Sequence, residues 1–482
     1  MAPAANGDSQ SSGHNVSLLI DGESVQSGSK FPVINPADGS SVWTYSSATV
    51  EDAQRAVESA AAAFPAWAKT SAVERSEILR KAASLYAERK DQLAEYMKLE
   101  TAADDGFIGF NIEATAKQLQ DVANRATAIQ GSFPQLEDDS RSALVLREPY
   151  GVILGIAPWN APYILGTRSV AAALVTGNTA ILKGSEMSPR CFRAIVDIFH
   201  DSGLPKGCLN LVFAAPENAV QVTEALIKHP AIGKVNFTGS TMVGGSVAAM
   251  AGKYLKPVLL ELGGKASAIV CDDADLKKAA TFCLLGAFIH SGQVCMGTER
   301  IIVHSSIAKA FEEELKNTMG TLHPESGAGP TVISSKSKSR VQGLISDAIS
   351  KGASPICGED PGKQDKLQRT VLAKVAPGMD LYYTESFGPV ASFHVFETED
   401  EALALANDTD YGLAGAIFTE NLAKGLRMAK KYTTGAVHIN SMSIHDEAAL
   451  PHGGVKSSGF GRFNSDQGLN EFLRTKVITW EN

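Results

Sequence analysis

The sequence predicts an α/β protein built on doubly wound parallel sheets. Between residues 151 and 262, short apolar runs alternate with helical stretches of roughly 10–15 residues, which is the spacing of right-handed βαβ units. A second run of the same kind starts near residue 273. With 482 residues, of which 44% are apolar and 20% charged, the chain can bury a sizeable core in several domains.

The chain begins with short strands and amphipathic helices before the alternation starts. Residues 17–20 and 42–45 are strand-like, and Thr49 with Asp52 forms a capping-box pattern that opens an Ala-rich helix. Apolar residues at helical spacing predict three further helices, at residues 72–88, 90–100 and 111–130. A polar break then precedes a strand-like run at residues 143–147.

The alternating region supplies a series of buried strands joined by helices. The strands are expected at residues 152–157, 179–183, 209–214, 234–237 and 257–262. The helices between them are expected at residues 163–174, 189–200, 217–228 and 241–254. Strands separated in this way lie parallel in one sheet, which is the architecture of dinucleotide-binding domains.

A second α/β run follows, in which Asp273 is the expected N-cap of the first helix. Its first helix runs to about residue 290, and a strand at residues 300–304 and a helix at residues 307–322 follow. Its later elements are a polar loop and two strands, at residues 358–366, 392–396 and 415–418. The second run therefore predicts another sheet covered by helices.

Charge and composition exclude several classes of function. Lys plus Arg is 44 and Asp plus Glu is 53, so the net charge of −9 and the lack of a basic run argue against a nucleic-acid partner. No apolar stretch reaches the roughly 18 residues of a membrane-spanning helix. Residues 1–16 lack a basic segment followed by an apolar run, so we expect a flexible tail, no secretory signal and a cytoplasmic protein.

The cysteines and histidines show no metal-binding spacing. The six cysteines form no C-x-x-C pair, and the ten histidines form no H-E-x-x-H or H-x-x-x-H motif. We therefore expect reduced thiols and no metal site. The absence of a G-x-S-x-G motif also argues against a serine hydrolase.

Two strand ends carry residues suited to a dinucleotide. Gly239, Ser240 and Gly244 lie where a strand ends and a helix begins, and small residues there leave N–H groups open to a phosphate. A tight turn without a ligand is an equal alternative, because G-x-G-x-x-G is absent. Lys183 and Glu186 follow another strand, where they could bind ribose hydroxyls and where Glu186 would repel a 2′-phosphate. A solvated charged loop is the alternative.

Three residues could carry covalent chemistry. Cys295 is flanked by small residues and is a candidate nucleophile, although a buried inert thiol is the alternative. Glu261 interrupts an apolar strand, so it is either a general base or a structural acceptor. Asn160, just past a strand, could donate to an oxyanion or cap a turn. The inert role is expected for the other cysteines: Cys191, Cys208, Cys271, Cys283 and Cys357.

Taken in order, these residues resemble the aldehyde dehydrogenase superfamily from about residue 33 to residue 480. The motifs that carry the resemblance lie at residues 158–160, 183–186, 237–244, 261–265, 292–295, 385–389 and 453–459. Each motif is weak alone, but the ordered set is specific. Within the superfamily the chain is most similar to the salicylaldehyde, benzaldehyde and vanillin dehydrogenases, on cues at residues 106–111, 295–300 and 445–448.

The resemblance implies NAD-dependent oxidation of an aldehyde, with aromatic aldehydes as the substrate class. Cys295 would add to the carbonyl carbon, Asn160 would stabilise the oxyanion, and Glu261 would activate water to release the acid. It assigns the cofactor to Ile156, Pro158, Trp159, Lys183, Ser185, Glu186, Gly239, Ser240, Gly244, Leu262, Gly263, Glu385 and Phe387. It assigns the substrate to Phe107, Phe110, Ala161, Leu165, Arg168, Val294, Met296, His445 and His452.

Several positions depart from the pattern of the superfamily. Gly184 replaces a common Pro, Ala161 replaces a common aromatic residue, and His452 replaces the usual Phe. The last two alter the substrate tunnel, in which Phe107 and Phe110 would stack on a ring. Arg168 lies about two helical turns beyond Asn160, so it could contact a ring hydroxyl, with a structural salt bridge as the alternative.

Two other functions remain open beside aldehyde oxidation. A catalytically silent scaffold is disfavoured because Cys295, Glu261 and Asn160 are all present. Transfer of the thioester to coenzyme A is disfavoured because Glu261 suits hydrolysis. Neither alternative is excluded by the sequence.

The resemblance also implies an aldehyde dehydrogenase-like domain organisation and a homodimer or homotetramer. A Rossmann-type cofactor domain would take residues 17–130 and 150–262, and an α/β catalytic domain residues 263–456. An oligomerisation arm would take residues 131–149 and 471–482, where it closes exposed strand edges.

Overall fold

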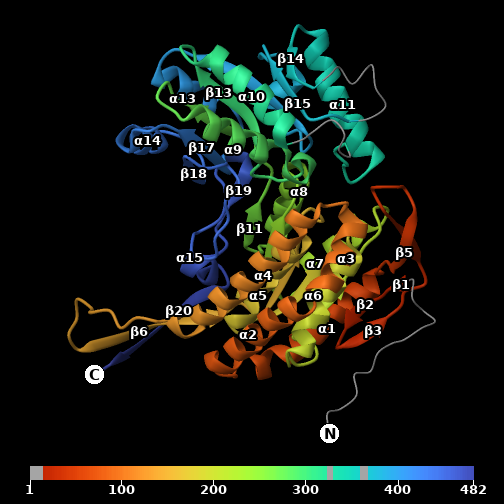
Figure 1. The fold of residues 1–482 in the computed structure, drawn as a ribbon. Helices are drawn as coiled ribbons and strands as arrows, with labels where there is room; N and C mark the ends of the chain where they lie inside the picture. Colours follow the sequence, from red (N-terminus) through yellow and green to blue (C-terminus); the bar gives the residue numbers. More distant parts are fainter. Residues whose placement is uncertain (1–14, 323–328, 359–366) are drawn as a thin grey trace.

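Two large sheets form the body of the molecule, one above the other in Figure 1. The computed structural model describes residues 15–322, 329–358 and 367–482. A three-stranded sheet and a two-stranded ribbon complete the described strands. No helix in these ranges is long and apolar enough to cross a membrane.

The first sheet contains the strands of the alternating region. Its order is β19–β11–β10–β7–β8–β9–β2–β3, and the neighbours from β11 to β9 pair in parallel. The strands span β2 Leu18–Ile20, β3 Glu23–Val25, β7 Val152–Ile156, β8 Thr179–Lys183, β9 Leu209–Val212, β10 Ile232–Thr238, β11 Val258–Glu261 and β19 Gly459–Phe460. The chain runs outward from β7 to β9 and returns to β10 on the other side of β7, which makes a topological switch point between β7 and β10.

Helices cover both faces of the first sheet. Right-handed crossovers place α5 and α6 on one face and α7 and α8 on the other. Helix α1 packs against α7, while α2, α3 and α4 pack outside α5 and α6. The helices span α1 Val50–Trp67, α2 Ala72–Glu88, α3 Lys90–Thr101, α4 Asp105–Arg125, α5 Pro162–Val175, α6 Pro189–Asp201, α7 Ala219–Lys228 and α8 Thr241–Lys253.

The second sheet has the order β14–β15–β16–β13–β12–β17–β18. Its strands span β12 Ala266–Val270, β13 Thr298–His304, β14 Ser354–Cys357, β15 Thr370–Ala373, β16 Val390–Phe396, β17 Ala414–Phe418 and β18 Ala436–Ile439. Its helices span α9 Leu276–Phe288, α10 Ala308–Leu322, α11 Ser335–Ser350, α12 Asp380–Tyr383, α13 Glu399–Asn407 and α14 Leu422–Ala429. Separate apolar clusters form where α9 and α10, and where α13 and α14, pack against it.

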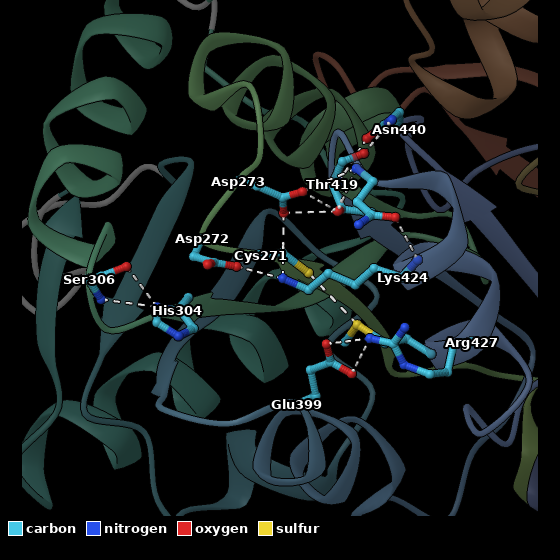
Figure 2. Close-up of polar contacts among 12 residues, drawn as sticks. Cys271, Asp272, Asp273, His304, Ser306, Glu399, Thr419, Lys424, Arg427 and Asn440 are labelled. Carbon is cyan, nitrogen blue, oxygen red and sulfur yellow. Dashed lines mark hydrogen bonds and ion pairs between the residues drawn. The ribbon is translucent and has the colours of Figure 1, made fainter.

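A polar network ties together the carboxyl ends of β12 and β17 (Figure 2). Asp273, after β12, accepts hydrogen bonds from the Thr419 hydroxyl at 2.8 Å and from the Asn421 N–H at 3.1 Å. Lys424 of α14 pairs with Asp272 at 2.5 Å and with Asp273 at 3.5 Å. The network therefore fixes α14 at the carboxyl end of the second sheet.

A ribbon of two antiparallel strands projects from the body at the lower left of Figure 1. Strand β6 (Arg141–Pro149) pairs along its whole length with β20 (Leu473–Glu481). Strand β20 follows the short helix α15 (Ser465–Asn470) in the chain. Apolar side chains remain exposed on this ribbon: Leu144, Val477, Ile478 and Trp480. The ribbon thus offers an uncovered apolar surface.

The structure corrects several predicted boundaries. Residues 15–16, predicted as tail, form β1 (Asn15–Val16), which pairs with β5 (Ser41–Ser46) beside β4 (Lys30–Ile34). Residues 1–14 lie outside the described residues, as does the predicted loop 358–366 beyond residue 358. Helix α4 starts six residues before its predicted start because the Asp104 side chain accepts the Phe107 N–H at 2.8 Å and caps it.

Candidate active site

The site lies at the switch point of the first sheet, below the amino end of the second. Segments that follow β7 and β10 meet there, as expected for ligand sites in doubly wound sheets. A cleft of about 240 Å³ opens between them. Many predicted residues line it: Pro158, Trp159, Asn160, Leu165, Gly239, Ser240, Glu261, Gly263, Cys295, Glu385 and Phe387.

The thiol of Cys295 points at a buried carboxylate. Its Sγ lies 3.3 Å from Oε1 of Glu261, the last residue of β11, whose side chain is 1% exposed. Burial, together with the nearby Glu261 charge, raises the pKa of Cys295 well above its ordinary value. The thiol is therefore protonated at rest at neutral pH, and the adjacent carboxylate is the group placed to take its proton.

A tight turn brings Cys295 to this position. His290 and Ser291 have φ values of 48° and 55°, so the chain turns sharply within residues Ile289–Gly292, which follow α9. Across the cleft, a Cβ on Gly264 would lie 2.3 Å from the Cys295 carbonyl oxygen. Glycine is therefore required at position 264, because the two backbones approach this closely.

The side-chain amide of Asn160 is held in a fixed orientation beside the thiol. Its Nδ2 donates to the Gln293 carbonyl oxygen at 3.0 Å, and the amide is buried. The Gln293 side chain is itself fixed, because its Oε1 accepts the Ile333 N–H at 2.8 Å. An amide held in this way can present its second N–H to an oxygen on the reacting carbon.

One end of the site has the donors that a dinucleotide needs. Ser240 is the N-cap of α8, yet its side chain makes no capping hydrogen bond, so the first N–H groups of that helix are open to a phosphate. A Cβ on Gly244 would lie 2.3 Å from a Leu262 methyl carbon, so glycine allows α8 to pack this closely. These features fit a pyrophosphate at the start of α8.

The ribose candidates lie further from the thiol. Burial lowers the pKa of Lys183, and Glu186 opposes that shift. Glu186 lines a separate cleft of about 780 Å³, and the Ser185 hydroxyl lies 3.4 Å from its carboxylate. Ile156 is buried in the strand before this region. Both clefts together provide room for an extended ligand.

At the other end of the cleft, Glu385 and Phe387 lie near the thiol. Glu385 accepts the Gly264 N–H at 2.8 Å, and burial raises its pKa to about 8. Phe387 has a φ of 45° and makes an edge contact with Trp159, with ring centroids 5.9 Å apart. These residues could hold a ribose and a flat ring beside Cys295.

Glu299 and Lys265 lie within motifs of the predicted family resemblance, but the sequence assigned neither of them a role in this site. Glu299 accepts the N–H of Ser386 at 2.7 Å and pairs with Lys265 at 2.5 Å. Lys265 also donates to the Thr384 carbonyl at 2.8 Å. This buried pair therefore fixes the segment that carries Glu385 and Phe387. The sequence does carry a signal for Glu299. Like Glu261, it is a charged residue next to the apolar residues of a strand.

Removing one partner of this pair is expected to destabilise the protein strongly. Glu299→Gln would leave the Lys265 ammonium buried without a counter-charge, and such a loss costs about 3–5 kcal/mol of unfolding free energy. Urea unfolding of both proteins measures the difference. Glu312→Gln removes the exposed partner of Lys316 and should cost less than about 1 kcal/mol. Equal small losses in the two variants would show that the buried pair contributes little.

The predicted substrate residues separate into two groups. Phe107 stacks on His290 with ring centroids 4.6 Å apart, and Phe110 lies 6.4 Å from Phe107 and is largely exposed. Ala161 precedes α5, and Val294 packs near Cys295. In contrast, three residues border a different and much smaller cavity of about 30 Å³: Met296, His445 and His452.

Arg168 makes the salt bridge that was the alternative to a substrate contact. Its guanidinium pairs with Asp446 inside the protein. Burial alone would raise the pKa of Asp446, but Arg168 lowers it to about 2. The charge of Arg168 is therefore compensated within the protein.

The remaining cysteines lie away from this cleft. Cys191, Cys208, Cys271, Cys283 and Cys357 are all buried. Among the described residues, no group of three His, Cys, Asp or Glu side chains is arranged to hold a metal ion. The reactive groups around Cys295 are thus its thiol, the Glu261 carboxylate and the Asn160 amide.

Comparisons with known proteins agree on one family. The description "Aldehyde dehydrogenase family" matches residues 23–478. A vanillin dehydrogenase of Pseudomonas fluorescens is 42% identical over 475 residues, which cover 97% of this chain and 98% of that protein.

Solved structures give the same result. The structure of a salicylaldehyde dehydrogenase from Pseudomonas putida G7 complexed with salicylaldehyde is similar with a TM-score of 0.93 and 34% identity, covering 97% of this chain and 98% of the other. A betaine aldehyde dehydrogenase from Staphylococcus aureus in complex with NAD⁺ gives a TM-score of 0.91 and 31% identity, covering 96% and 94%.

Proposed function

Because the chain belongs to the aldehyde dehydrogenase family, we propose that it oxidises an aromatic aldehyde to the carboxylic acid with NAD⁺ as hydride acceptor. The observation that carries this proposal is the contact between the Cys295 thiol and the Glu261 carboxylate, 3.3 Å apart in the cleft that Asn160 also lines. It combines a nucleophile, a base and an oxyanion donor at one point.

Cys295 opens the reaction by adding to the carbonyl carbon. Its proton passes to Glu261, a C–S bond forms, and the oxygen gains the negative charge that Asn160 and the Cys295 N–H stabilise. The aldehyde alone is a poor hydride donor because losing hydride would leave an acylium-like carbon, whereas the alkoxide can expel it. A bound nicotinamide supplies the acceptor for that hydride.

Glu261 completes the reaction on the thioester that remains on Cys295. The carboxylate takes a proton from water, the resulting hydroxide attacks the acyl carbon, and the C–S bond breaks to release the acid and the thiolate. For this step Glu261 must first have lost the proton that it took from the thiol. The carboxylate therefore acts as a base twice in each turnover.

The cofactor residues support NAD⁺ over NADP⁺. Ser240 and Gly239 would bind the pyrophosphate, Lys183 and Glu186 the adenosine ribose, and Glu385 the nicotinamide ribose. The negative charge of Glu186 would repel a 2′-phosphate at the same position. Phe387 and Trp159 would pack near the nicotinamide.

The charge balance of the tunnel supports a neutral aromatic substrate. Asp446 compensates the charge of Arg168, and Phe110, which packs on the buried Phe107, is an exposed aromatic residue. A carboxylate on the substrate would therefore add a second negative charge beside a pair that is already neutral, and burying it there would be unfavourable. The relatives named after vanillin and salicylaldehyde support the same class.

A substrate panel tests this proposal. We expect kcat/KM for benzaldehyde, salicylaldehyde or vanillin to exceed that for succinic semialdehyde by about 100-fold or more, the ratio expected when a charged group is buried without a partner. The formation of NADH from NAD⁺, and then of NADPH from NADP⁺, measures the substrate preference and the cofactor preference in one series. Hexanal is the control for size without a ring or a charge. Equal values for succinic semialdehyde and benzaldehyde would contradict the substrate class.

We also propose that the protein is a homodimer or homotetramer. The ribbon of β6 and β20 exposes Leu144, Val477 and Trp480. The outer edge of β20 pairs with no other strand of the described chain, and the outer edge of β6 carries only the bridge between Val145 and Ser132. A second copy would cover this surface. Sedimentation of the full chain measures the mass, and a monomer at micromolar concentration would contradict this proposal.

A further inference from the structure

The catalytic carboxylate has a second neighbour besides the thiol. Oε1 of Glu261 lies 3.4 Å from Nε2 of His452, as well as 3.3 Å from the thiol of Cys295. His452 is buried, with 9% of its surface exposed. The carboxylate is therefore held between a sulfur and an imidazole.

The backbone holds the His452 ring in this position. His452 donates its N–H to the Phe463 carbonyl at 2.9 Å, and the Phe463 N–H returns a hydrogen bond at 2.8 Å. The residue lies in the segment between β18 and the 3-10 turn Lys456–Ser458. These two bonds fix the backbone from which the ring projects, and the ring itself is enclosed by the protein beside Glu261.

Beyond the imidazole lies the small cavity, which has room for about one water molecule. His438, His445 and His452 all border it, together with Asp446. Nε2 of His438 is buried and has no hydrogen-bond partner among the described residues. Burial lowers the pKa of His438 to about 4, with His445 and His452 adding to the shift, so the His438 ring is neutral at pH 7. The cavity thus offers polar groups that can accept or pass on a proton.

The charged groups around His452 leave Glu261 as its partner. Asp446 is already paired with Arg168, and the three histidines share the cavity. The usual residue of the superfamily at this position is Phe, which has neither a donor nor a proton to transfer. His452 therefore adds a function that the fold does not need for packing.

We propose that His452 is a positioning residue that holds the Glu261 carboxylate beside Cys295 and removes its proton before the thioester is hydrolysed. This inference rests on the proposed function. When Glu261 is ionised, Nε2–H of His452 donates to Oε1. When Glu261 holds the thiol proton and the ring carries its own proton on Nδ1, the free Nε2 accepts the proton of Glu261 and Nδ1 gives its proton to water, which leaves the carboxylate ready to act on the hydrolytic water. The ring regains the Nδ1–H tautomer by proton exchange with water.

The test measures the two half-reactions without cofactor or aldehyde. p-Nitrophenyl acetate acylates a reactive thiol and releases p-nitrophenolate in a burst, and the following steady state reports hydrolysis of the acyl-enzyme. For His452→Phe, which restores the usual residue, we expect an unchanged burst and a fall in the steady-state rate of about tenfold or more. The pH profile of the steady state should also lose one ionisation.

Two further variants separate proton transfer from packing. His452→Gln keeps an N–H donor, so it should recover part of the rate without restoring the lost ionisation. His394→Gln is the matched control, because His394 is a histidine of the second sheet with the same 9% exposure that bonds to Ser392 instead of Glu261. It should leave the burst, the steady state and the pH profile unchanged.

Two results would overturn the proposal. The first is a His452→Phe enzyme whose steady-state rate and pH profile match those of the wild type. The second is a His452→Phe enzyme in which burst and steady state fall together with the melting temperature, which indicates only a packing role. If Cys295→Ser keeps the acylation and ester hydrolysis of the wild type, the proposed function fails instead, independently of His452.

Discussion

Replacing Cys295 with serine is expected to lower aldehyde-dependent NADH formation by on the order of 10⁴-fold or more, as removal of a catalytic nucleophile does in other enzymes. The serine hydroxyl is a far weaker nucleophile than the thiolate that forms when Glu261 takes the thiol proton. The substitution replaces the sulfur of Cys295 by oxygen and leaves the backbone contacts of the cleft in place. NADH absorbance at saturating benzaldehyde measures the loss.

The variant must keep its fold and its ligand site for this loss to report on chemistry. Cofactor binding, followed by the quenching of tryptophan fluorescence, is expected to stay close to that of the wild type, because Trp159 and Glu385 remain in place. Cys357→Ser, in β14 of the second sheet, is the matched control and should retain activity. A folded Cys295→Ser protein with undiminished NADH formation would remove the thiol from the mechanism.

Sequence alone predicts the strand ends that build the site. The strands around β7 and β10 are apolar on both faces because helices cover both sides of a parallel sheet, so each reads as a short apolar run. Chain direction and right-handed crossovers then place Asn160 and Ser240 at the same edge. These local rules therefore predict where the site lies in the first sheet.

The contacts within the site depend on how the two sheets dock, and no local rule contains that information. Cys295 and Glu261 are 34 positions apart and belong to segments of different sheets. Arg168 meets Asp446 across 278 positions, and His452 meets Glu261 across 191. Sequence reasoning could name these residues one by one, but it could not pair them.

Boundary errors hid other parts of the site. The predicted strand began at residue 300, whereas β13 begins at Thr298, so the buried Glu299 fell outside it. Glycines at positions 106 and 109 weakened the helical pattern ahead of Asn111, although the Asp104 cap starts α4 there. In both cases a polar group with a specific buried or capping partner overrode the local propensity.

Replacing Glu261 with glutamine is expected to stop the reaction after one turnover. The amide keeps the shape of the carboxylate but cannot take a proton from water, so hydrolysis of the thioester should slow by about 10²–10⁴-fold. Glu261 is also the group that takes the thiol proton, so the first turnover should be slower than in the wild type, but it should still yield NADH when the Cys295 thiol loses its proton to solvent instead. Rapid mixing with benzaldehyde should show a burst close to one NADH for each Cys295, followed by a slow phase.

The acyl group retained on Cys295 distinguishes this outcome from a general loss of activity. Intact-protein mass spectrometry after the burst should show the benzoyl thioester on Glu261→Gln and unmodified protein for the wild type. Hydroxylamine, which attacks thioesters without a general base, should release the acyl group and permit a second burst. If the variant shows neither burst nor adduct, Glu261 is needed chiefly to deprotonate the thiol, because its 3.3 Å contact with Sγ serves the first step as well. If turnover continues at the wild-type rate, another group activates the water, and the carboxylate at the end of β11 has a structural role.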